Sequence, residues 1–256
     1  MKIFVCLKQV PAKDSLLRLD DASGWIRESD LSHEINEPDA FALEEGLRLK
    51  EKHGGEVVVV SAGPARAASA IREALAKGAD RGIHVEHETL DRLDSFTTAR
   101  ALAAAIRGEA FDLVLTGLQS DDLGSGQTGV VMAELLGVPH ATIIMEVQKL
   151  DAAIRVKREL EAGWFQHVEM PLPALLTIQS GINKVRYATL MGIKKAKTKE
   201  LKRITPAELG VDLSPQQRIG RMYAPQKTKQ TQILGGSAKQ AAAALVEKLK
   251  FEARVL

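Results

Sequence analysis

The sequence contains very little cysteine and few aromatic residues. Cys6 is the only cysteine in 256 residues, so the chain can form no internal disulfide bond and no cysteine-based metal cluster. Aromatic residues make up 4% of the chain, too few for the stacking surfaces that bind single-stranded nucleic acids. We therefore expect a protein of a reducing compartment, with no metal site and no nucleic-acid partner.

Long apolar runs are also missing from the sequence. No stretch approaches the roughly 18 consecutive apolar residues of a membrane-spanning helix. The apolar run at residues 2–10 is too short for the core of a signal peptide, and no cleavage-like sequence follows it. We expect a cytoplasmic bacterial protein that does not insert into a membrane.

Charge is nearly balanced over the whole chain but not along it. The formal net charge is +2, so the chain as a whole does not attract polyanions. From Lys184 to Lys199, however, lysines and arginines recur with no acidic residue among them. An apolar cluster, Leu190, Met191 and Ile193, lies inside this basic run. Two interpretations are open: a solvated loop whose apolar residues fold back on the core, or a surface that recognises a partner.

Apolar strands alternate with helical patterns over about the first 145 residues. Strands are expected at 2–10, 56–64, 82–87 and 111–117, and helices at 38–55, 65–80, 94–108 and 126–137. The strand at 56–64 is continuously apolar, as in parallel sheets covered on both faces. The alternation predicts an α/β fold with a parallel twisted sheet and helices on both of its faces.

The pattern changes after residue 145. Strands are expected at 142–150, 153–160, 165–170 and 172–180 without intervening helices, and they indicate an antiparallel extension of the sheet. Residues 214–236 carry two prolines and little periodicity, which indicates an extended segment lying on another surface; a helix capped by Ser237 follows. We assign residues 1–216 to a nucleotide-binding domain and 217–256 to a C-terminal arm and helix.

The loop "TGLQSDDLGSGQTG" is the richest candidate site. In an open parallel sheet, ligands bind at the carboxyl ends of strands, where this loop and the loops "LKQVPAK" and "SAGPA" are expected. Glycines let the backbone approach a ligand, and the start of the following helix favours an anion. The loop matches neither the GxGxxG nor the Walker pattern. It could hold only turn glycines and caps, but its length and position favour a mononucleotide, with phosphate near Gly126 to Thr128 and ribose near Asp121 or Asp122.

No reacting group stands out. Cys6 lies inside a strand and is expected to pack there, and the histidines have no acidic partner at a useful spacing. A nucleotide site of this kind indicates binding rather than turnover. A nucleotide hydrolase or ligase would need a phosphate-activating motif such as SGGxDS, which "LKQVPAKDS" lacks. An RNA-binding role for the basic run is weakened because Tyr187 is its one aromatic residue.

The stretch "VKRELEAGWFQHVEMPLPALLTIQSGINKVRYATLMGIKKAKTK" closely resembles the signature of the electron transfer flavoprotein β subunit. "LKEKHGGEVVVVSAGP", "ALAKGADRGIHV" and the "LVLTGLQSDD…QTG" loop are also similar to that family, so the resemblance covers nearly the whole chain. Val185 stands where the family usually has proline, and Gly192 stands where mitochondrial members have asparagine.

The resemblance implies an adenine nucleotide hydrolase-like fold and a heterodimer with an α subunit that holds most of an FAD. It implies AMP in this chain and residues 217–256 packed on the α subunit. Donors would be flavin dehydrogenases such as acyl-CoA dehydrogenases, and the acceptor an electron transfer flavoprotein–quinone oxidoreductase. An electron-bifurcating branch, with a second FAD in place of AMP and NADH oxidised there, is the alternative. The chain would be an electron-carrier subunit rather than an enzyme.

The resemblance also assigns residues to these roles. Glu159 should approach the FAD, and residues 184–202 should form a recognition loop with Leu190 as its apolar anchor. The AMP pocket should be lined by Cys6, Asn36, Ser61, Ala62, Gly117, Gln119, Ser120, Asp121, Gly124, Ser125, Gly126, Gln127 and Thr128. The partner-binding residues should be Tyr187, Leu190, Met191, Ile193, Lys194 and Lys195.

Overall fold

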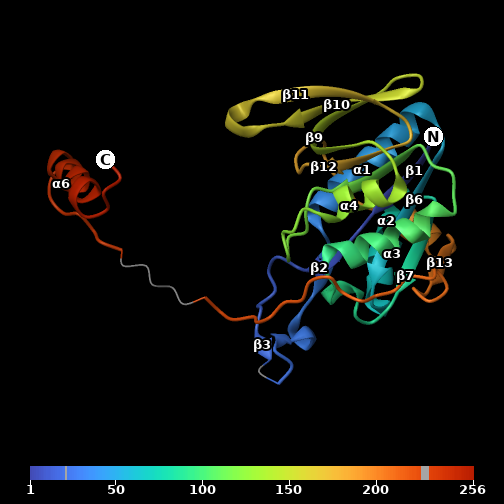
Figure 1. Ribbon diagram of the computed structural model, residues 1–256, viewed down its shortest axis with the longest axis horizontal. Helices are drawn as coiled ribbons and strands as arrows, with labels where there is room; N and C mark the ends of the chain where they lie inside the picture. The colour runs from blue at the N-terminus through green and yellow to red at the C-terminus, as the bar shows by residue number, and fades with distance from the viewer. Residues whose placement is uncertain (21, 226–230) are drawn as a thin grey trace. The chain divides into compact units, whose positions relative to one another are not determined.

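The chain forms two compact units, Met1–Gly220 and Arg221–Leu256 (Figure 1). The computed structural model describes residues 1–20, 22–225 and 231–256. Part of the extended segment expected at 214–236 therefore lies outside the described residues, at 226–230.

The first unit is built on a nine-stranded sheet in the order β11-β10-β9-β12-β8-β1-β6-β7-β13. From β9 to β13 in this order, every neighbouring pair is parallel, whereas β10 is antiparallel to both β9 and β11. The parallel sheet and its antiparallel extension are thus confirmed. The strands are β1 (Lys2–Cys6), β6 (Glu56–Gly63), β7 (Arg81–Glu86), β8 (Leu113–Gly117), β9 (His140–Lys149), β10 (Ala153–Glu159), β11 (Phe165–Pro171), β12 (Ala174–Ile178) and β13 (Leu201–Ile204).

One strand of the expected antiparallel extension was placed wrongly. β12 lies between β8 and β9 and is parallel to both. All five of its residues are buried, as in the interior of a parallel sheet. The chain returns from β9 to β12 through β10 and β11 instead of through a helix, so a rule based on alternating helices and strands could not detect it.

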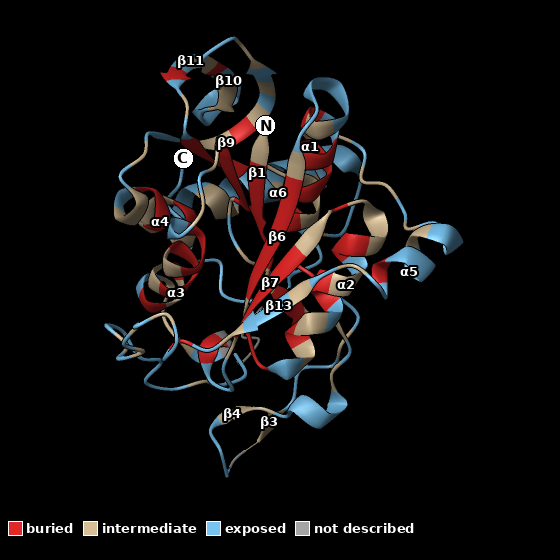
Figure 2. Ribbon diagram, turned by 90° about the vertical axis from the view of Figure 1, so that its right-hand side faces the viewer, coloured by how far each residue is buried: buried red, intermediate tan, exposed pale blue. Residues whose placement is uncertain are grey.

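Helices cover both faces of the parallel sheet, as Figure 2 shows. Ile3 and Val5 of β1 pack in one core cluster with residues of α1 and α2, whereas Phe4 and Cys6 pack in another with residues of α3 and α4. This strict alternation follows from the two-residue period of a strand. The helices are α1 (Glu37–His53), α2 (Ala68–Lys77), α3 (Ser95–Arg107), α4 (Thr128–Leu136), α5 (Leu190–Ala196) and α6 (Ala238–Phe251).

Several small elements escaped the sequence interpretation. Two short antiparallel pairs, β2 (Gln9–Pro11) with β5 (His33–Ile35) and β3 (Leu19–Asp20) with β4 (Trp25–Ile26), belong to the segment between β1 and α1. Helix α5 and strand β13 form within and just after the basic run, which was expected to leave the sheet as an arm. The 3-10 turns are η1 (Glu28–Asp30), η2 (Ala65–Ala67), η3 (Leu90–Arg92) and η4 (Glu161–Gly163).

In the second unit, α6 begins as expected. The hydroxyl of Ser237 accepts a hydrogen bond from the backbone N–H of Gln240, whose side chain in turn accepts one from the backbone N–H of Ser237. This reciprocal capping box satisfies two backbone donors at the start of the helix.

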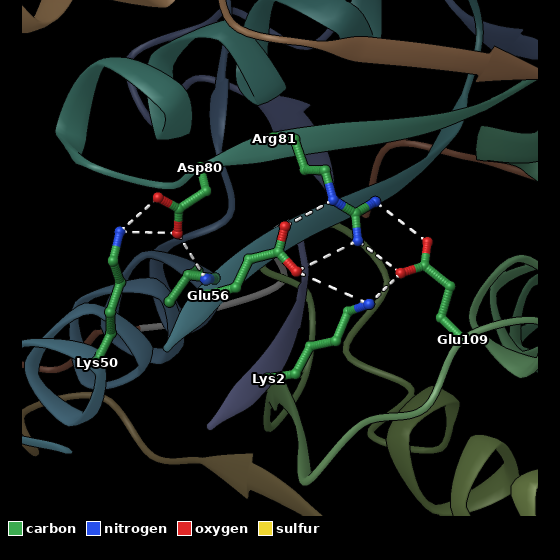
Figure 3. Close-up of polar contacts among 7 residues, drawn as sticks. Lys2, Lys50, Glu56, Asp80, Arg81 and Glu109 are labelled. Carbon is green, nitrogen blue, oxygen red and sulfur yellow. Dashed lines mark hydrogen bonds and ion pairs between the residues drawn. The ribbon is translucent and has the colours of Figure 1, made fainter. Parts of the chain in front are cut away.

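Charged side chains bind the amino ends of three parallel strands together (Figure 3). Arg81, at the start of β7, donates to Glu56 at 2.8 Å and to Glu109 at 3.1 Å. Lys2, at the start of β1, also pairs with both glutamates. Because this network lies at the opposite end of the strands from the candidate nucleotide loop, its role is to stabilise the sheet.

Arg81→Met should lower the free energy of unfolding by about 2 kcal/mol, a value between those for exposed and buried ion pairs. The substitution leaves two partly buried glutamates with Lys2 as their remaining partner. Urea unfolding at low salt measures the effect. The control Arg155→Met breaks an exposed pair with Glu169 and should change stability by less than about 1 kcal/mol. Equal effects of the two substitutions would contradict a structural role for the network.

Candidate functional site

A hollow opens at the carboxyl ends of β1 and β8, where the direction of chain winding reverses. From β1 the chain passes to β6 and β7 on one side, and it then crosses to β8 on the other side. Cys6, Leu7 and Lys8 at the end of β1, and Thr116 and Gly117 at the end of β8, line the hollow. A reversal of this kind leaves a crevice between the diverging loops, and α/β proteins bind ligands there.

The buried carboxylate of Asp39 joins the two strands at this crevice. It accepts the backbone N–H of Lys8 at 2.7 Å and that of Gly117 at 2.8 Å. A Cβ on Gly117 would lie 2.4 Å from an oxygen of Asp39, so only glycine permits this approach. Burial raises the pKa of Asp39 to about 7, against the opposing effect of the two backbone donors.

Asn36, just before α1, fixes the start of the loop after β8. Its side chain donates to the carbonyl of Gln119 at 2.9 Å and accepts the backbone N–H of Asp121 at 2.9 Å. The Asp121 carboxylate in turn accepts the N–H of Glu37, in the first turn of α1, at 3.4 Å. Asp122 pairs with Lys8. Asp122 is thus paired with a cation and Asp121 with a backbone N–H at a helix start, which weakens their repulsion of an anion in the hollow.

The amino terminus of α4 forms another wall. Gln127, Thr128 and Gly129 line the hollow. Among the described residues, no side chain caps this helix, and its first turn carries no acidic residue. The amide groups of a helix start favour negative charge. Another side of the hollow is apolar and is formed by Leu90, Leu93 and Leu102.

A second feature is the basic segment, residues 184–202, which is held against α1 and α2. Arg186 donates to Glu44 of α1 at 2.8 Å, and it also pairs with Glu51. Arg72 of α2 donates to the carbonyls of Ala196 and Lys199 at 2.6 and 2.8 Å. Folded in this way, the segment cannot be a freely moving tail.

Helix α5 presents the apolar residues of that segment outward. Thr189 caps the helix by accepting the N–H of Gly192 at 3.0 Å. A Cβ on Gly192 would lie 2.2 Å from the carbonyl oxygen of Ala76, so glycine lets α5 lie against the end of α2. Leu190 is 83% exposed and Met191 is 63% exposed. The interpretation in which these two residues fold back on the core is wrong.

Comparisons with known proteins identify the family of the chain. A family model for the electron transfer flavoprotein domain matches residues 23–209. The electron transfer flavoprotein subunit beta of Methylophilus methylotrophus is 40% identical over 252 residues, covering 94% of this chain and 96% of the relative. That of Bacillus subtilis (strain 168) is 32% identical over the full length of both chains, and that of Homo sapiens is 39% identical over 84% and 85% of them. The chain belongs to the electron transfer flavoprotein β-subunit family.

The hollow of this electron transfer flavoprotein chain brings together most of the residues expected to line a nucleotide pocket. Ser61, Asp121 and Gly124 lie outside its lining. By the alternation along β6, Ser61 points to the same face as Val59, toward α1 and α2, whereas Ala62 faces the hollow. The buried hydroxyl of Ser61 has no hydrogen-bond partner among the described residues. The expected residues that line the hollow are Cys6, Asn36, Ala62, Gly117, Gln119, Ser120, Ser125, Gly126, Gln127 and Thr128.

Sequence reasoning missed Lys8 and Asp39. Lys8 stands in the loop "LKQVPAK", which was noted as a strand-end loop, and that position could have pointed to it. Asp39 lies inside a helix, and its backbone partners are distant in sequence, so no local pattern marks it. Burial raises the pKa of the Cys6 thiol well above its usual range, which agrees with packing rather than reactivity.

Other expectations concern the extension and the arm. Glu159, at the end of β10, accepts a hydrogen bond from Gln179 at 3.2 Å. Phe165, the first residue of β11, and Trp164 just before it are exposed. Lys194 and Lys195 are exposed in the last turn of α5, and Tyr187 is exposed shortly before the helix. Within the described part of the chain, no helix is both long and apolar enough to cross a membrane, and no cluster of three or more potential metal ligands occurs.

The pH dependence of stability should reveal the buried carboxyl of Asp39. Its pKa is about 7 in the folded chain and about 3.9 in an unfolded one, so the folded state binds the proton more tightly. Stability therefore falls as the pH rises from about 4 to about 7, by at most about 1.4 kcal/mol per pH unit. Asp39→Asn should remove this slope in urea unfolding. A wild-type advantage over the variant that grew with pH would mean that the backbone donors outweigh burial.

Proposed function

We propose that this β subunit binds AMP in the hollow at the ends of β1 and β8, joins an α subunit, and docks flavin dehydrogenases through α5. The observation that carries the proposal is the hollow itself. It lies at the reversal of the sheet, with the uncapped start of α4 on one side and an apolar wall on another.

The lining suits an adenine mononucleotide. The amide groups at Thr128 and Gly129 would hold the phosphate, as helix starts do. The adenine would lie among Leu90, Leu93 and Leu102. Because Gly117 has no side chain, the backbone there could come close enough to hydrogen-bond the polar edge of the adenine. In this proposal, AMP serves assembly rather than chemistry.

The FAD would be shared with the α subunit and held mostly by it. When bound, the flavin supplies the redox chemistry. This chain would contribute the extension formed by β9, β10 and β11, with Glu159 near the flavin. The exposed Trp164 and Phe165 support an interface there, because aromatic residues are enriched in buried interfaces. The C-terminal unit from Arg221 would pack on the same partner.

The basic segment would recognise the electron donors. Exposed Lys194 and Lys195 would steer an acidic partner, which mainly raises the association rate. Leu190 would then enter an apolar pocket on that partner and supply most of the affinity. Acyl-CoA dehydrogenases are the proposed class of donor, and a quinone oxidoreductase specific for electron transfer flavoproteins is the proposed acceptor.

Co-production of this chain with the α subunit from the same genome tests the proposal. We expect a one-to-one complex whose flavin is reduced when a flavin dehydrogenase and its substrate are added. The chain without the α subunit should hold no FAD. Failure of the two chains to associate, or reduction of the flavin by NADH alone, would contradict the proposed role; the second result would favour electron bifurcation.

A further inference from the structure

Lys8 connects the floor of the hollow to the far side of the loop above it. Among the described residues that line the hollow, Lys8 is the only cation. Its backbone is fixed because its N–H donates to Asp39. Its ammonium group lies 2.7 Å from each carboxylate oxygen of Asp122 and 3.4 Å from the hydroxyl of Ser120. Ser120 lines the hollow and Asp122 does not, so the side chain of Lys8 reaches past the lining to the outer part of the loop.

The part of the loop held in this way has little other attachment. Asn36 fixes the loop at Gln119 and Asp121. Beyond that point, the amide of Leu123 donates to its neighbour Asp122, and the amide of Gly124 donates to Ser120. Within the described residues, Lys8 alone holds residues 122–126 through a hydrogen bond or ion pair from outside the loop.

The pair is sheltered enough to hold the loop and accessible enough to open. The side chains of Lys8 and Asp122 are 27% and 24% exposed. An ion pair in this range is screened less by salt than a fully exposed one, and it can still exchange with water. Leu123, Ser125 and Gly126, which follow Asp122, line the hollow. Any nucleotide that enters or leaves on this side must therefore displace the segment that Lys8 holds.

We propose that Lys8 and Asp122 form a latch that sets how long the nucleotide stays bound. The latch rests on the proposed nucleotide site and adds a pair of positioning residues to it. With the pair formed, residues 122–126 close over the ligand, and release requires the pair to break. Lys8 acts through the loop and not on the phosphate, because Asp122 already occupies its ammonium group.

The test measures release of labelled AMP, and of labelled adenosine, from the complex with the α subunit. Lys8→Met and Asp122→Asn should each accelerate release of both ligands about fivefold, the upper end for a pair of this exposure. The double variant should release no faster than either single variant. Exchange of the charges, with Lys8→Asp and Asp122→Lys together, should restore slow release. Lys13→Met is the matched control, because it breaks an exposed pair with Glu37 outside the lining, and it should leave release unchanged.

The possible outcomes distinguish failure of the latch from failure of the proposed nucleotide site. Faster release of AMP with unchanged release of adenosine would overturn the latch and make Lys8 a phosphate ligand. Unchanged release of both ligands would also overturn it. If the wild-type complex carries FAD in place of AMP, the proposed AMP site fails, and the release rate of that FAD decides the latch by the same variants. A complex with no nucleotide would overturn both proposals.

Discussion

Replacing Leu190 with alanine should slow reduction of the complex with the α subunit by the proposed flavin dehydrogenase donor about thirtyfold in kcat/KM. Leu190 is 83% exposed at the start of α5, so the truncation removes no contact that the chain needs to fold. A central apolar residue that fills a partner's pocket contributes about 2 kcal/mol to binding, which is about thirtyfold. The rate is measured as flavin reduction at limiting concentrations of the complex.

The control for this prediction is Leu16→Ala. Leu16 is 63% exposed in the segment before β3 and is not part of the basic segment, so its truncation should leave the rate unchanged. Assembly with the α subunit and FAD content should be normal in both variants. An unchanged reduction rate in Leu190→Ala would refute the anchor role. An equal loss in both variants would point to a general effect on the surface.

Gly117→Ala should lower the free energy of unfolding by about 3 kcal/mol and empty the proposed nucleotide pocket. The new Cβ would lie 2.4 Å from a carboxylate oxygen of Asp39, 2.6 Å from Pro38 and 2.8 Å from the backbone nitrogen of Asp39. The start of α1 would have to move away from β8, which breaks the hydrogen bond at the centre of the hollow. Overpacking of a rigid contact reaches this magnitude. Urea unfolding and nucleotide content measure the two effects.

Gly108→Ala is the matched control for that substitution. A Cβ at Gly108 meets no atom within 4 Å, and the backbone φ there is −73°, which alanine adopts freely. This variant should be as stable as the wild type, or more stable by about 0.5 kcal/mol, because alanine restricts the unfolded chain. Equal stability and equal nucleotide content of Gly117→Ala and Gly108→Ala would contradict the close approach of Gly117 to Asp39.

Local patterns were sufficient to predict the parallel half of the fold. The apolar strands at β1, β6 and β8 and the glycine stops of α1 and α2 are marked by neighbouring residues, and the structure confirms them. The position of β12 was not predictable in this way. Its parallel pairing with β8 depends on where β10 and β11 lead the chain, and this is a long-range property of the sheet.

In the candidate site, too, features marked by neighbouring residues were predictable and features that depend on long-range contacts were not. The loop from Gly117 to Thr128 was predictable because glycines and polar residues follow a buried strand there. Asp39 and Lys8 carry no such signal, because their roles arise from contacts between segments far apart in sequence. Helix α5 was missed because it has only seven residues, and its position depends on the contact of Gly192 with α2.

The nucleotide content of the complex with its α subunit shows whether the hollow binds AMP. The purified complex is denatured, and the released nucleotides are separated on a column and quantified against protein. We expect one FAD and one AMP per heterodimer. Two FAD without AMP would contradict the AMP site and assign the protein to electron bifurcation. One FAD with no AMP would mean that the hollow does not bind its proposed ligand.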